Sequence, residues 1–71
     1  MTLWCLHGHV DETRCELRLG PDGFLVGLRM GDELILEESH RDLRAAKARA
    51  GALRQRLVGR GWLERHPSWP C

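Results

Sequence analysis

The chain has 71 residues, of which 42% are hydrophobic and 30% charged, and its formal net charge is +1. This length suits one domain, and the composition excludes a disordered segment. No apolar run approaches the roughly 18 residues that a membrane span needs, and the N-terminus lacks a basic region before an apolar one. We therefore expect a cytoplasmic protein that does not bind membranes.

Four extended segments are expected before residue 40. Residues 2–7 begin with an apolar run that suits a strand. Residues 14–19 alternate between apolar and charged side chains, which is typical of a strand with one face on a core. Residues 24–30 and 33–37 alternate in the same way. In the last of these segments, Leu34 and Leu36 are expected to face inward.

Two tight turns link the last three segments. Gly20-Pro21-Asp22-Gly23 combines a proline that presets φ with a glycine that accepts a positive φ. Gly31-Asp32 fits a two-residue hairpin loop with glycine first. These links predict an antiparallel meander of three strands, which residues 2–7 can join as a fourth.

Residues 40–60 predict an amphipathic helix. Ser39 is the expected N-cap, with Asp42 three residues later. At the other end, Gly59 and Gly61 are expected to terminate the helix, with Trp62 folding back on its last turn. Apolar side chains recur at steps of three and four residues and form one stripe: Leu43, Ala46, Ala50, Leu53 and Leu57.

These elements together predict a single small α+β domain over residues 1–71. Its architecture is an antiparallel β-meander of three to four strands packed against one long C-terminal helix. Residues 62–71 contain two prolines and two tryptophans and are expected to form an irregular tail. A domain of this size has a marginal core.

Charge is divided between the two halves of the chain. Residues 1–39 carry three basic and eight acidic residues, whereas residues 40–71 carry eight basic and two acidic ones. Six cations flank the helix stripe and could follow a phosphate backbone: Arg44, Lys47, Arg49, Arg54, Arg56 and Arg60. Alternatively, their stems cover the edge of the core while their charges meet strand carboxylates.

Two surfaces are candidates for protein binding. Leu3, Leu25 and Ile35 share the solvent-facing parity of their strands, which predicts a covered apolar patch outside the sheet. A line of small residues on the outward side of the helix is the second candidate: Ala45, Ala48 and Ala52. We expect self-association as a homodimer, because a second copy would enlarge the marginal core.

Metal binding and catalysis are not expected. Cys5, His7, His9 and Cys15 are residue types that ligate zinc, but their spacing is not that of a zinc knuckle. The two cysteines also suit a role as small apolar core residues. Because the chain has neither a nucleophile elbow nor a phosphate-binding glycine motif, we expect a protein that is not an enzyme and has no cofactor.

Two family resemblances bear on function. Pro21-Asp22-Gly23, followed by an alanine-rich helix, loosely resembles the HicB-type antitoxin half-domain, which implies binding to a small toxin. The order of a three-stranded sheet and then a helix also resembles the arm-binding domain of phage-type integrases, which implies DNA binding through the sheet. The chain lacks the further strand of the antitoxins. It also has Glu33 and Glu37 where an integrase-like sheet needs basic residues.

The sequence therefore predicts a non-catalytic interaction module that binds a protein partner or itself. The alternative is a nucleic-acid-binding protein that uses the arginine-flanked helix. Arginines paired with strand carboxylates would favour the first function, and an unpaired row of arginines would favour the second.

Overall fold

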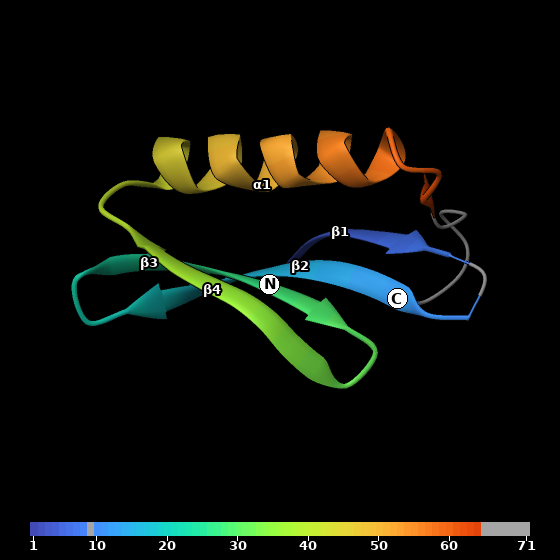
Figure 1. Cartoon of the computed structure of the whole chain (residues 1–71). Coiled ribbons are helices and arrows are strands. Elements are labelled where there is room, and N and C mark those ends of the chain that lie inside the picture. Colours follow the sequence, from blue (N-terminus) through green and yellow to red (C-terminus); the bar gives the residue numbers. More distant parts are fainter. Residues whose placement is uncertain (9, 65–71) are drawn as a thin grey trace.

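The computed structural model describes residues 1–8 and 10–64, which form an antiparallel sheet and one helix (Figure 1). The elements are β1 (Thr2–His7), β2 (Glu12–Gly20), β3 (Gly23–Met30), β4 (Glu33–His40), α1 (Leu43–Val58) and β5 (Leu63–Glu64). The strands lie in the spatial order β4-β3-β2-β1-β5, so β1 to β4 lie side by side in the order of the sequence. The expected α+β meander is confirmed.

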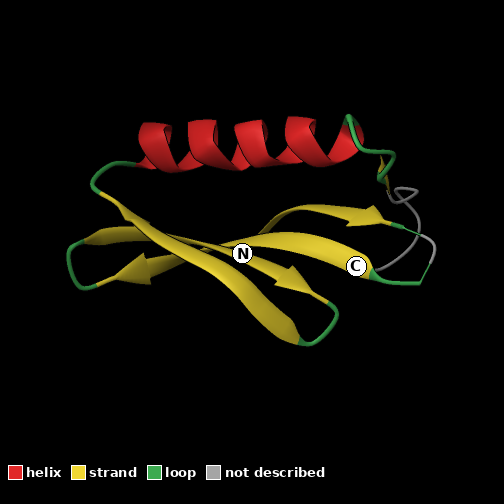
Figure 2. Ribbon diagram, in the orientation of Figure 1, coloured by secondary structure: helices red, strands yellow, loops and turns green. Residues whose placement is uncertain are grey.

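The helix covers one face of the sheet, and no described element covers the other, which we call the open face (Figure 2). Three residues of the predicted helix stripe are buried, whereas Leu43 at its start is 39% exposed. The Trp4 indole also donates a hydrogen bond of 2.9 Å to the Ala50 carbonyl and so joins β1 to the middle of α1. The buried cluster between the layers consists of Cys15, Leu17, Val26, Leu28, Ala46, Ala50 and Leu53.

Both predicted hairpin turns are present. Gly20 pairs with Gly23, and Met30 pairs with Glu33, so each loop contains two residues. Gly23 has φ 148° and Gly31 has φ 60°. Positive φ values are open to glycine and strained for other residues. The turn chemistry read from the sequence therefore determines where β2, β3 and β4 begin to pair with one another.

The start of the helix differs from the prediction. Asp42 is the N-cap, and its side chain accepts a hydrogen bond of 2.8 Å from the Ala45 amide. Ser39 instead lies in β4, where it pairs with Leu25. The reason is that β4 continues to His40, so the backbone first leaves the sheet beyond Ser39.

The end of the helix is glycine-terminated, as predicted. The Trp62 amide donates to the Leu57 carbonyl and the Gly61 amide to the Val58 carbonyl, both at 3.1 Å. Gly61 has φ 101°, so this pair of bonds forms a Schellman cap. Trp62 lies close to Gly8, since a Cβ atom built on Gly8 would be 3.1 Å from the Trp62 ring.

The predicted irregular tail was wrong at its first residues. Leu63 and Glu64 form β5, which pairs with His7 and Leu6 of β1. The helix cap explains the difference, because it reverses the chain toward the β1 edge of the sheet. The rest of the predicted tail, residues 65–71, lies outside the described residues.

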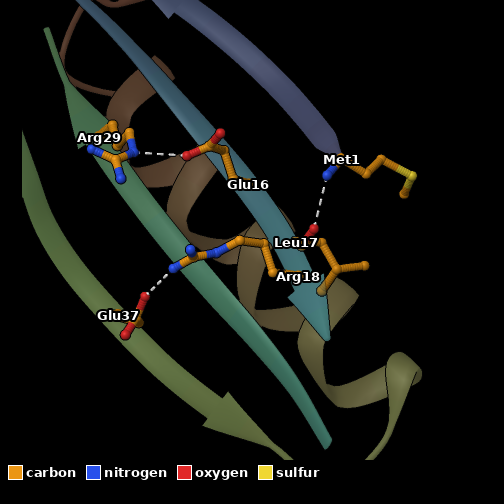
Figure 3. A network of polar contacts seen from close by, with 6 residues as sticks. All are labelled: Met1, Glu16, Leu17, Arg18, Arg29 and Glu37. Atoms are coloured by element: carbon orange, nitrogen blue, oxygen red, sulfur yellow. Dashed lines mark hydrogen bonds and ion pairs between the residues drawn. The ribbon is translucent and has the colours of Figure 1, made fainter. Parts of the chain in front are cut away.

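Met1 extends the pairing of β1 with β2. Its amino group donates to the Leu17 carbonyl at 2.9 Å (Figure 3). The Leu17 amide in turn donates to the Met1 carbonyl at 2.7 Å.

Within residues 1–8 and 10–64, no helix combines the length and the apolar character that crossing a membrane requires.

Candidate functional site

The predicted apolar patch of Leu3, Leu25 and Ile35 does not form one surface. A bulge in β1 lies between Thr2 and Trp4, and Leu3 packs against the buried core cluster. Leu25 lies on the open face and is half-buried. Ile35 is the extra residue of a second bulge, in β4. Each bulge adds one residue to its strand and so changes which side chains share a face.

Because of the bulge in β4, Leu34 does not face the core as the sequence predicted. Leu34 pairs with Arg29, whereas Leu36 pairs with Leu28. Leu28 is a core residue, while Arg29 lies on the open face, so Leu34 faces outward instead of inward. Its Cδ1 atom lies 3.5 Å from the position of a Cβ atom built on Gly27. Leu34 is therefore an exposed residue of the open face, next to the β4 edge.

The open face of the sheet carries ion pairs between side chains of different strands (Figure 3). Arg18 Nη2 donates to Glu37 Oε2 at 2.5 Å, joining β2 to β4. Arg29 Nε donates to Glu16 Oε1 at 2.8 Å, joining β3 to β2. Salt bridges this exposed contribute little to stability. They do make this face polar, which disfavours it as an apolar docking surface.

A third acid of the sheet, Glu38, pairs with the helix. Arg49 donates from Nε to Glu38 Oε1 at 2.9 Å and from Nη2 to Oε2 at 3.2 Å. His40 Nε2 lies 3.3 Å from the same carboxylate. The hydrogen bond from Arg49 is the main reason that the pKa of Glu38 is lowered. This pair links β4 to α1 as well as balancing two charges.

We expect Glu38→Gln to reduce the loss of stability on acidification. The pKa of Glu38 in the folded protein lies below its ordinary value of 4.5, because Arg49 favours the charged form. The pair therefore contributes stability above pH 4.5, and this contribution is lost as the pH falls through the lowered pKa. Glutamine has no such charge to lose.

Urea unfolding at about pH 7 and about pH 3 measures this effect. The wild type should lose more free energy of unfolding between the two conditions than Glu38→Gln does. Asp22→Asn is the matched control, since Asp22 is exposed in the β2–β3 turn and has no ion pair among the described residues. Equal losses in the wild type and in Glu38→Gln would contradict the assignment.

The six cations predicted to flank the helix are divided into two groups. Arg49 pairs with Glu38, and Arg54 pairs with Glu64 of β5. These two contacts match the prediction that helix arginines meet strand carboxylates. The other four have no ion pair among the described residues: Arg44, Lys47, Arg56 and Arg60. The exposed helix surface thus keeps a net positive charge.

Of the four residues with zinc-ligand chemistry, the three that the structure describes form no group that could hold a metal ion. Cys15 pairs with Trp4 and lies in the core between the sheet and the helix. Cys5, the residue after Trp4, pairs with Arg14 and lies on the opposite face of the sheet. Burial, and then the nearby charge of Glu16, raise the pKa of Cys15 to about 11. A thiol must lose its proton to ligate zinc, so Cys15 is poorly suited to that role. His9 lies outside the described residues.

A hollow of about 450 Å³ lies where the β1–β2 and β3–β4 loops meet. Its lining combines carboxylates with two basic side chains, and the buried Nε atom of Arg14 has no hydrogen-bond partner in the described part of the chain. This mixture of charges is suited to polar ligands. Sequence reasoning missed the hollow, because its polar lining comes from the β1–β2 hairpin and from the distant β3–β4 loop: His7, Asp11, Glu12, Arg14 and Asp32.

The outer edge of β4 is the other feature that stands out. β4 is the last strand of the sheet at this side, and no described strand pairs with it beyond β3. Leu34 and Ile35 along this edge are 41% and 46% exposed. An edge strand leaves half of its backbone N–H and C=O groups available to another strand.

Comparison of the chain with family models, with curated proteins and with solved structures finds no match. The resemblances to HicB-type antitoxins and to integrase arm-binding domains thus stay hypotheses. Function must be argued from the surfaces of the molecule itself.

Proposed function

We propose that this protein is a small, non-catalytic interaction module of the cytoplasm. It binds a macromolecular partner, or a second copy of itself, by adding a strand to the sheet at β4. The edge of β4 is the observation that supports this proposal, because it combines backbone groups that no described strand pairs with and two exposed aliphatic side chains. Strand addition draws its affinity from main-chain hydrogen bonds and its selectivity from alternate side chains.

A second candidate function is nucleic-acid binding by α1. The cations at Arg44, Lys47 and Arg56 favour it, since they are exposed and have no carboxylate partner in the described part of the chain. They would attract a phosphate backbone without reading its sequence. The acidic sheet beneath the helix opposes this function, as do the pairings of Arg49 and Arg54.

Site-specific photo-cross-linking in living cells tests both functions. A photoreactive amino acid replaces Ile35 at the β4 edge, Gln55 on the exposed side of α1, or Asp22 in a hairpin turn as the control. All three positions are exposed, so each probe should leave the fold intact. Thermal unfolding of the purified variants checks that it does.

We expect the probe at Ile35 to form a discrete protein adduct that the Asp22 control does not form. A nucleic-acid adduct confined to Gln55 would instead support the second function. In that case, the logarithm of affinity should fall with the logarithm of salt concentration at a slope near −0.9 per phosphate contacted. No adduct at Ile35 above the Asp22 background would contradict binding at the β4 edge.

A further inference from the structure

We propose that the partner strand at β4 is β4 of a second copy, in antiparallel orientation. This inference rests on the function proposed above and specifies the partner. The two copies are related by a two-fold axis perpendicular to the sheet, because only that operation reverses the strand and keeps the sheet continuous. Both helices then lie on the same face of the joined sheet.

The charges at the two ends of β4 favour this orientation. Asp32 and Glu33 stand at the beginning of the strand, while Arg41 follows its last residue, His40. Glu33 and Arg41 are exposed and form no ion pair within the described residues. In an antiparallel pair, Glu33 of each strand comes near Arg41 of the other, while the carboxylate of Asp42 accepts its hydrogen bond from the Ala45 amide at the helix start. Symmetry provides this attraction twice, whereas parallel strands would place like charges together.

The acids in the middle of β4 do not oppose the pairing. Glu37 is compensated by Arg18 and Glu38 by Arg49, both within one copy. Charged residues on an edge strand normally discourage association with another edge. In the proposed dimer, Glu37 and Glu38 of one copy lie near the same residues of the other copy, close to the two-fold axis. Their charges are already balanced by Arg18 and Arg49 of their own copy. The uncompensated charges are those at the strand ends, where they are complementary.

The apolar residues of the edge add to the same interface. Leu34 and Ile35 lie in the first half of β4, so the second copy brings its own pair to the other end of the junction. Four partly exposed aliphatic side chains are thus covered when two copies meet. The open face of the sheet is a poorer dimer surface, because its ion pairs would have to be desolvated.

Sedimentation velocity over a hundredfold range of protein concentration tests the proposal. The variants are Glu33→Arg, Arg41→Glu and the double exchange Glu33→Arg/Arg41→Glu, together with Ile35→Lys. Arg56→Glu is the matched control, since Arg56 is an exposed cation in the last turn of α1, at the end of the helix remote from the β4–α1 connection. Circular dichroism at the lowest concentration verifies that each variant is folded.

We expect a concentration-dependent dimer in the wild type and in Arg56→Glu. Each single reversal at a strand end, and Ile35→Lys, should raise the dimer dissociation constant by about tenfold. The double exchange should return it to within about threefold of the wild type, because the charges are complementary again. A strict monomer at all concentrations, or a dimer unaffected by these variants, would overturn the inference.

The outcome also separates this inference from the broader proposal. If the wild type is a monomer but the probe at Ile35 still captures another protein, strand addition at β4 stands and the second copy is excluded as the partner. If there is neither a dimer nor an adduct, both the inference and the proposed function fail.

Discussion

Replacement of Leu53 by alanine is expected to lower the free energy of unfolding by about 2 to 5 kcal/mol. Leu53 is 7% exposed and lies in the buried cluster with residues of β2 and β3. The helix covers the sheet chiefly through two alanines and this leucine, so Leu53 provides much of its apolar contact. Since small domains have total stabilities of only about 5 to 15 kcal/mol, this loss should unfold a large part of the protein.

Leu43→Ala is the matched control on the same helix. Leu43 is 39% exposed, and its truncation should cost less than about 1 kcal/mol. Urea unfolding of the two variants, followed by circular dichroism, gives both free energies. Similar costs at the two positions would mean that α1 does not pack on the sheet through the Leu53 side of its stripe.

The architecture of this protein could be predicted because its signals are local. Two short glycine-containing turns determine the β2–β3 and β3–β4 hairpins, and the spacing of Ala46, Ala50 and Leu53 determines the buried side of the helix. The predicted orientations of Leu3 and Leu34 were wrong, because a bulge inserts one residue into each of their strands and shifts its register. Bulges in β1 and β4 turn Leu3 inward and Leu34 outward, and neither bulge has a glycine or proline to mark it. The two positions can be assigned only from the pairing of neighbouring strands.

The candidate site was less predictable than the fold. The separation of acidic and basic residues was evident from the sequence, but their pairing depends on distances across the two layers. Arg49 contacts Glu38 because β4 runs beneath the helix, and Arg54 contacts Glu64 because the helix cap returns the chain to β1. The edge position of β4 follows from its place at the end of the meander. The uncompensated charges at its two ends are found only once the internal ion pairs are known.

Replacement of Gly23 by alanine is expected to be as damaging as the loss of a core side chain. Gly23 begins β3 with φ 148°, which a residue with a side chain rarely adopts. An added Cβ atom would lie 2.3 Å from the His40 carbonyl oxygen, a backbone atom that cannot rotate away. Strained backbone alone costs about 1 to 3 kcal/mol. The end of β4 must also move to make room for the added Cβ atom. We therefore expect Gly23→Ala to lower the free energy of unfolding by about 3 kcal/mol or more.

Gly51→Ala should have the opposite sign, although the substitution is chemically the same. Gly51 lies within α1, is exposed, and has no atom within 4 Å of an added Cβ. Alanine should therefore stabilise the helix by about 0.5 to 1 kcal/mol, because it has less backbone freedom to lose on folding. Thermal and urea unfolding of both variants measures the contrast. A neutral Gly23→Ala would show that the contact between the start of β3 and the end of β4 is looser than described, and would also weaken the case for β4 as a well-ordered docking edge.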